Sequence, residues 1–163
     1  MKKINLDPAA FFIVNIILSA SFVFLDQVSK FVALRLLNQN QSIPLIKDFL
    51  HITLVYNTGS AFGLLRNQNW ILTYISILAI IFILWLMVRQ PQFKSRIYLQ
   101  FWQFALLLIL SGATGNLIDR IYRGFVVDFI DVRIWPIFNL ADTMITCGVF
   151  LLILILFNKK AFE

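Results

Sequence analysis

One stretch of the chain, from Ser111 to Asp142, concentrates the side chains that could carry chemistry. It contains four of the eight acidic residues, and a long apolar segment lies on either side of it. Its carboxylate and amide side chains belong to Asn116, Asp119, Asp128, Asp131, Asn139 and Asp142. Carboxylates beside a membrane are costly, so their presence needs a functional or a structural reason.

Asp128 and Asp142 have surroundings typical of a carboxylate pair that acts as acid and base. Asp128 lies in the apolar sequence VVDFI, and Asp142 falls within the last apolar segment. Where two such groups meet, like charge and desolvation raise the pKa of one, and the pair shares a proton. One member can then activate water while the other protonates a leaving amine, without a metal or a covalent intermediate.

Other interpretations of these carboxylates stay open on spacing alone. Asp119 could pair with the adjacent Arg120, and Asp131 with Arg133. A cation or proton pathway, or a structural network between helices, would also place acidic residues here. The sequence has no His-Glu-x-x-His zinc helix and no Gly-x-Ser-x-Gly elbow. We therefore expect no metal site and no cofactor.

The composition indicates that these residues belong to an all-α integral membrane protein. Hydrophobic residues make up 60% of the chain and charged residues only 13%, against about a quarter in soluble domains. The net charge of +6 could suggest a nucleic-acid partner, but the basic residues flank apolar segments and form no stripe. We expect one membrane-embedded domain over residues 1–163 and no nucleic-acid binding.

Four apolar segments are long enough to cross a membrane as helices, over residues 9–37, 70–88, 98–119 and 136–157. The first resembles a signal peptide at its start, but its helical pattern continues past Asp26 to Leu37, which favours an uncleaved helix. Pro136 suits the first turn of the fourth helix. Positive residues at both ends of the chain and near Lys94 place both termini in the cytoplasm.

The connecting segments, residues 38–69 and 120–135, are then extracytoplasmic. The sequence from Ile43 to Tyr56 predicts a short strand or two, and Asn57–Gly59 a hairpin turn. Residues 120–135 are expected to form a loop. We expect His51 at the surface or the membrane interface, because it has no partner at metal-ligand spacing. Cys147 is expected to be a small packing residue inside the fourth helix.

Spacing along the helices predicts which polar residues share a face. Asn116 and Asp119 lie three apart, as do Asn139 and Asp142, and each pair therefore shares a helix face. Asp26 and Lys30 lie four apart and can pair, either to close the helix end or to support the acidic site. A further group would let another helix or a substrate approach closely: Ser111, Gly112, Ala113 and Gly115.

Most of these residues fall within five motifs that together resemble one family, the lipoprotein signal peptidases or signal peptidase II. The motifs are DQVSK at Asp26–Lys30, YNTGSAFGLL at Tyr56–Leu65, GATGNLIDR at Gly112–Arg120, VVDFIDV at Val126–Val132 and FNLADTMITCG at Phe138–Gly148. They occur in the family's order and cover nearly the whole chain. Each motif is weak by itself, but five in order are highly specific.

The resemblance implies a bacterial membrane aspartyl endopeptidase that cleaves signal peptides just before a cysteine bearing a diacylglyceryl group. Asp128 and Asp142 would be its catalytic pair. The residues that would line or support the site are Asp26, Lys30, Asn57, Gly59, Asn116, Asp119, Arg120 and Asn139. The segment Asp131–Ile137 looks short beside many members of the family.

The resemblance also implies the setting of the enzyme. A small extracytoplasmic β-sheet cradle would follow the first helix, and a mobile element within residues 120–135 would cover the substrate. The protein would be a monomer in the bacterial plasma (inner) membrane, with its active site near the extracytoplasmic face. Its partners would be lipid-modified prolipoproteins, membrane lipid and inhibitors of the globomycin type.

Overall fold

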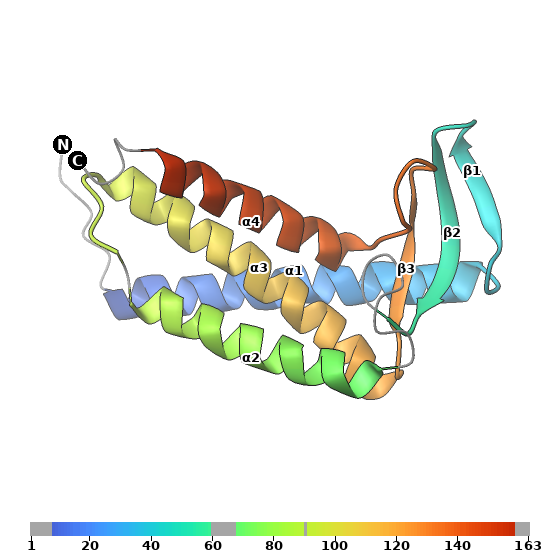
Figure 1. The fold of residues 1–163 in the computed structure, drawn as a ribbon, viewed down its shortest axis with the longest axis horizontal. Helices are drawn as coiled ribbons and strands as arrows, with labels where there is room; N and C mark the ends of the chain where they lie inside the picture. The colour runs from blue at the N-terminus through green and yellow to red at the C-terminus, as the bar shows by residue number, and fades with distance from the viewer. Residues whose placement is uncertain (1–7, 60–67, 90, 159–163) are drawn as a thin grey trace.

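The computed structural model describes residues 8–59, 68–89 and 91–158, and these residues form four helices and one small sheet. The helices are α1 (Pro8–Leu36), α2 (Asn69–Val88), α3 (Arg96–Tyr122) and α4 (Leu140–Phe157). The strands are β1 (Ser42–Ile46), β2 (Leu50–Asn57) and β3 (Val126–Asp131). Figure 1 shows the sheet at one end of the helices, opposite the start of α1 and the end of α4.

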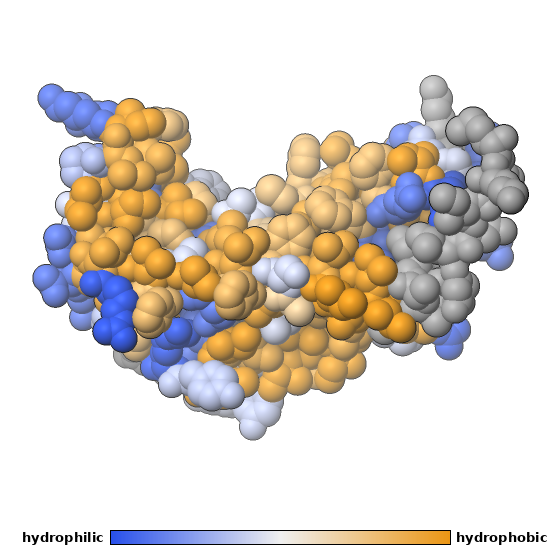
Figure 2. Space-filling view, turned by 180° about the vertical axis from the view of Figure 1, so that it is seen from behind, coloured by the Kyte–Doolittle hydropathy of each residue, from blue (hydrophilic) through white to orange (hydrophobic). Residues whose placement is uncertain are grey.

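All four helices are long and apolar enough to cross a membrane, as the sequence predicts. The spanning part of α3 is 67% buried, whereas the other three are at most 22% buried. Helix α3 is therefore the centre of the bundle, and it contacts α1, α2 and α4. The outward faces are apolar, and Figure 2 shows hydrophobic residues gathered over the body of the molecule. Such a surface suits a multi-pass membrane protein.

Small residues let α3 and α4 approach closely. A Cβ atom added at Gly112 would collide with the carbonyl oxygen of Ala141 on α4. At Gly148 of α4, a Cβ atom would lie 2.7 Å from the carbonyl oxygen of Ala105 on α3. The predicted close approach at the glycines of α3 is confirmed, and it brings the start of α4 against the polar part of α3.

The sheet is antiparallel, with the strand order β1-β2-β3, and its strands run across the helix axes (Figure 1). One face packs on the end of α1, where Ala33 and Leu37 form a buried cluster with Leu54 and Val127. Val55 of β2 pairs with Asp128 of β3. The sheet thus carries Asp128 to the helix end where α4 begins.

The structure corrects three boundaries. Helix α4 begins at Leu140 rather than Pro136, because Asn139 caps it. Residues 120–135 are not a loop, since α3 continues to Tyr122 and residues 126–131 form β3. Asn57–Gly59 is not the hairpin turn: Asn57 ends β2, and the β1–β2 hairpin turns at residues 47–49, where Asp48 has a left-handed φ of 60°.

Two single residues also lie elsewhere than predicted. His51 is buried rather than at the surface, with 8% of its surface exposed, and its ring contacts Ser42 of β1 and Arg133. Cys147 is exposed rather than packed inside, since it lies on a face of α4 that does not meet α3. In a membrane this face of α4 would meet lipid.

Candidate active site

The two predicted carboxylates line one pocket at the sheet end of the bundle. Asp128 comes from the middle of β3 and Asp142 from the first turn of α4. The pocket has a volume of about 580 Å³, within the usual range for ligand sites. Its other lining residues are Val55, Tyr56, Asn57, Thr58, Gly59, Asn116, Arg120, Val126, Trp135, Pro136, Ile137, Phe138, Ile145 and Thr146.

Asp128 is almost fully buried, with 2% of its surface exposed, and both of its oxygens accept hydrogen bonds from amides. Asn57 Nδ2 donates to Oδ2 at 2.8 Å, and Asn139 Nδ2 donates to Oδ1 at 2.7 Å. Burial, and secondly the negative charge of Asp142, raise the pKa of Asp128 to about 7 despite these bonds. This carboxyl group can therefore gain or lose a proton near neutral pH.

Asp142 is held by a capping box at the start of α4. Its backbone N–H donates to Asn139 Oδ1 at 2.9 Å, and its Oδ2 accepts from the Asn139 backbone N–H at 3.3 Å. Its Oδ1 accepts from Asn116 Nδ2 at 2.7 Å. The motif that starts the helix thus also fixes the orientation of this carboxylate.

Asn116 and Asn139 connect the two carboxylates to each other. Asn139 Nδ2, which donates to Asp128, also lies 3.1 Å from Asn116 Oδ1. The same Asn116 oxygen accepts from Lys30 Nζ at 2.9 Å, so the Asn116 amide nitrogen points at Asp142. The predicted face of Asn116 therefore does meet the site, and Lys30 sets the direction of its amide.

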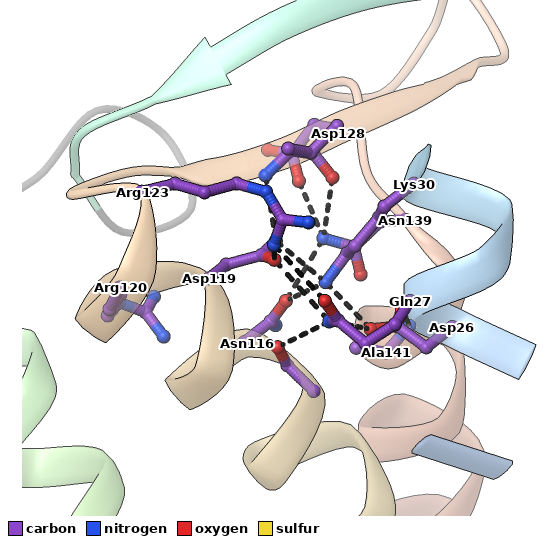
Figure 3. A network of polar contacts seen from close by, with 12 residues as sticks. Asp26, Gln27, Lys30, Asn116, Asp119, Arg120, Arg123, Asp128, Asn139 and Ala141 are labelled. Atoms are coloured by element: carbon purple, nitrogen blue, oxygen red, sulfur yellow. Dashed lines mark hydrogen bonds and ion pairs between the residues drawn. The ribbon is translucent and has the colours of Figure 1, made fainter. Parts of the chain in front are cut away.

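A buried ionic cluster adjoins the site through Asn116, as Figure 3 shows. Lys30 Nζ lies 2.9 Å from Asp26 Oδ2 and 3.0 Å from Asp119 Oδ2, and all three side chains are fully buried. The predicted Asp26–Lys30 pair is confirmed. Asp119 pairs with Lys30 and with Arg123, not with Arg120 as one interpretation had it, because adjacent helical residues point in different directions.

This cluster holds the backbones that carry the pair. Asp26 Oδ1 accepts from the backbone N–H of Ala141, next to Asp142, at 3.0 Å. Asp119 Oδ2 accepts from the backbone N–H of Val127, next to Asp128, at 3.0 Å. One buried carboxylate therefore anchors α4, the other anchors β3, and Lys30 lies between them.

Two members of the cluster were not predicted from the sequence, Gln27 and Arg123. Gln27 Nε2 contacts Asp26 and the carbonyl oxygen of Gly115, and its Oε1 accepts from Arg123 at 3.1 Å. The sequence did contain a signal for each. Gln27 lies within the DQVSK motif, and Arg123 follows Asp119 by four residues, the spacing of helical neighbours.

The remaining predicted residues lie at the rim of the site. The backbone N–H of Gly59 donates to Asn57 Oδ1 at 2.9 Å, which directs the Asn57 amide nitrogen to Asp128. Arg120 lines the pocket, and its Nη1 lies 3.4 Å from Ser76 Oγ of α2. Figure 3 shows Arg120 apart from the ionic cluster. Asp131, which pairs with Arg133 at 3.4 Å, lies outside the pocket.

The arrangement suits acid–base chemistry on a substrate in the pocket. It offers two carboxyl groups, one of them with a pKa near 7, and an arginine that lines the same pocket. Among residues 8–59, 68–89 and 91–158, no group of three or more His, Cys, Asp or Glu side chains is placed to hold a metal ion.

Comparisons with known proteins match most of the chain to one family. The family model described as Signal peptidase (SPase) II matches residues 18–158. A lipoprotein signal peptidase of Moorella thermoacetica is 42% identical over 137 residues, which are 84% of this chain and 88% of the relative. One from Clostridioides difficile (strain 630) is 43% identical over 140 residues, covering 83% of this chain and 90% of the relative.

Solved structures give the same result for the fold. A bacterial membrane enzyme solved at 2.3 Å resolution by the in meso method aligns with a TM-score of 0.81 at 36% identity, over 92% of this chain and 93% of that one. A second, solved at 1.9 Å, aligns with a TM-score of 0.79 at 35% identity, over 90% of this chain and 94% of that one. By sequence and by fold, the chain belongs to the signal peptidase II family.

Proposed function

We propose that this protein is a membrane aspartyl endopeptidase that removes signal peptides from diacylglyceryl-modified prolipoproteins, cleaving just before the lipidated cysteine. The observation that carries the proposal is the convergence of Asp128 and Asp142 on one pocket, where burial and mutual charge raise the pKa of Asp128 to about 7. Membership of the signal peptidase II family supports the substrate class.

The proposed reaction uses one proton shared by Asp128 and Asp142. The ionised member accepts a proton from a water molecule, and the oxygen of that water attacks the scissile carbonyl carbon. The protonated member then donates its proton to the amide nitrogen, and the C–N bond breaks to give a carboxylic acid and an amine. Arg120, which lines the same pocket, would offset the negative charge that develops on the carbonyl oxygen.

The asparagines have a positioning role in this proposal. Asn57 and Asn139 hold Asp128, while Asn116 and the capping box hold Asp142, so neither carboxylate turns away from the substrate. Asp26, Lys30 and Asp119 support the backbones on which the pair is carried.

The proposed orientation places the pocket near the extracytoplasmic face. The α2–α3 connection, with Arg89 and Lys94, lies at the bundle end opposite the sheet (Figure 1), and positive connections face the cytoplasm. Both termini are then cytoplasmic and the sheet is extracytoplasmic. A substrate whose acyl chains lie in the outer leaflet would reach the pocket from there. The enzyme would act as a monomer, and globomycin-type inhibitors would occupy the same pocket.

The test is cleavage of a diacylglyceryl-modified prolipoprotein by the purified protein, with the unmodified precursor as control. We expect cleavage of the modified precursor only. Asp128→Asn and Asp142→Asn should each reduce turnover by at least about a hundredfold, since each removes a proton-transfer group. Asp48→Asn, on the exposed hairpin, is the matched control and should retain turnover. Failure of the wild-type protein to process either precursor would refute the function, and near-normal turnover of either dyad variant would refute the assignment.

A further inference from the structure

The connection between β3 and α4 contains a strained residue that the acid–base chemistry does not use. Arg133 has a φ of 67°, in the left-handed region that residues other than glycine rarely adopt. Backbone strain of this kind persists only where surrounding contacts over-determine it, and it clusters at functional sites. The contacts of Arg133 therefore indicate what this part of the chain is built to hold.

Arg133 is tied to β3 and to β2 at once. Its backbone N–H donates to Asp131 Oδ1 at 2.9 Å, its Nη1 lies 3.4 Å from Asp131 Oδ2, and its Nη2 lies 2.8 Å from His51 Nδ1. Asp131 also accepts from Thr53 Oγ1 at 2.8 Å, and that hydroxyl lies 2.7 Å from Ser42 Oγ of β1. We call these five residues the Arg133 clamp.

The contact between Arg133 and His51 is accompanied by a second unfavourable feature, which concerns the His51 ring. A guanidinium only donates hydrogen bonds, so His51 Nδ1 must accept, and the ring proton lies on Nε2. Within the described part of the chain, Nε2 is buried and has no hydrogen-bond partner. An unsatisfied buried donor is unfavourable. Two unfavourable features, the left-handed φ and this N–H group, thus accompany the fixed guanidinium.

The clamp determines where the following residues go. The chain reverses directly after Arg133, with the Ile134 backbone N–H donating to the Val132 carbonyl at 2.7 Å. It is tied again at Phe138, whose backbone N–H donates to the Ile130 carbonyl at 3.0 Å. Residues 135–138, between these two ties, form the apolar wall of the pocket, and Trp135 at its outer edge is 59% exposed.

We propose that Arg133 is a positioning residue for substrate binding: through the clamp it holds Trp135 and the wall behind it against the acyl-bearing part of the substrate. The inference rests on the proposed peptidase function and adds a determinant of affinity to it. Because Arg133 lies outside the pocket, whereas Trp135 lines it, the effect of Arg133 passes through Trp135. The clamp then affects how tightly lipid-modified substrate binds and leaves the proton transfers unchanged.

The test is steady-state cleavage of a diacylglyceryl-modified prolipoprotein by Arg133→Asn. Asparagine readily adopts the left-handed backbone and keeps the backbone N–H bond to Asp131, so only the guanidinium contacts are lost. We expect KM to rise about tenfold, corresponding to about 1.4 kcal/mol of binding, with kcat nearly unchanged. Trp135→Ala should raise KM similarly, and the double variant should be no worse than Trp135→Ala alone. Arg133→Lys should recover part of the loss.

The control is Arg89→Asn, an exposed arginine at the opposite end of the bundle, which should leave both constants unchanged. His51→Phe removes the acceptor and the unsatisfied N–H together, so it should raise KM without lowering the melting temperature, even where Arg133→Asn folds poorly. Additive effects of Arg133→Asn and Trp135→Ala, a fall in kcat alone, or an unchanged KM in His51→Phe would each overturn the inference while wild-type cleavage stands. Absence of wild-type cleavage would overturn the proposed function as well.

Discussion

Replacing Asp128 by asparagine should change the pH dependence of stability in a direction fixed by the structure. In the folded protein, burial and then the charge of Asp142 raise the pKa of Asp128 from 3.8 to about 7. The folded state therefore binds this proton more tightly than the unfolded state does. The resulting stabilisation is fully present below pH 3.8, falls as the pH rises, and is lost above about pH 7.

The magnitude follows from the same two values. The shift of the Asp128 pKa from 3.8 to about 7 corresponds to about 4 kcal/mol of folding stability. About 3 kcal/mol of this stabilisation is lost between about pH 5 and about pH 8. The asparagine variant has no such loss. Its amide nitrogen must, however, face an amide donor of Asn57 or Asn139, which costs about 1–3 kcal/mol at every pH. We expect the variant to be no more stable than the wild type near pH 5 and more stable near pH 8.

The assay is thermal unfolding in detergent, followed by circular dichroism across this pH range. The melting temperature of Asp128→Asn relative to the wild type should rise by roughly 10 °C from about pH 5 to about pH 8. Asp131→Asn is the control, because the pKa of Asp131 is shifted in the opposite direction from that of Asp128. Burial acts to raise the pKa of Asp131, but hydrogen bonds from the Arg133 backbone N–H and the Thr53 hydroxyl outweigh it, so that pKa is lowered.

The stabilisation that Asp131 contributes is therefore present above its unfolded pKa and is lost only as the pH falls through its folded pKa. Asp131→Asn should destabilise the protein equally at pH 5 and pH 8. A melting-temperature difference for Asp128→Asn that stays constant or falls with pH would refute the raised pKa, and with it the proton shared by the two carboxyl groups.

Two further predictions concern the ionic cluster and the orientation. Asp119→Asn removes one of the two buried counter-charges of Lys30 and the carboxylate that pairs with Arg123. It should cost about 3 kcal/mol of stability, or roughly 10 °C in melting temperature. Asp48→Asn, on the exposed hairpin, should be neutral, and equal effects would argue against the anchoring role. In a Cys147→Ser background in intact cells, an impermeant thiol reagent should label a cysteine placed at Gln41 but not one placed at Lys94; the reverse pattern would invert the orientation.

The sequence was sufficient to predict the helices and to single out two carboxylates that line one pocket, because their signals are local or cumulative. Apolar segments of membrane length leave few alternatives to helices, and Asp142 in such a segment needs a reason to be there. Strand β3 was missed because VVDFID is short and pairs with β2, some seventy residues away in sequence (Asp128 with Val55). Only that pairing turns the segment from a loop into a strand.

The remaining misses have different physical causes. Pro136 favours the first turn of a helix, but the reciprocal bonds of Asn139 and Asp142 satisfy more backbone groups, so the helix begins later. The Asp119–Arg123 pair could have been predicted, because residues four apart on a helix are neighbours. The position of His51 could not have been predicted, because its burial and its contact with Arg133 depend on a strand register that no local pattern specifies.

The way Asp26 and Asp119 bind has a consequence for how the two carboxylates are presented. Each accepts from a backbone N–H beside its target, at Ala141 and at Val127, and each forms an ion pair with the same Lys30. Bonds to a backbone N–H do not depend on which side chain Ala141 or Val127 carries. They fix the orientation of the peptide group next to Asp142 or Asp128. In the proposed reaction, the positional entropy of Asp128 and Asp142 is therefore lost once, when the chain folds, and not again at each encounter with a substrate.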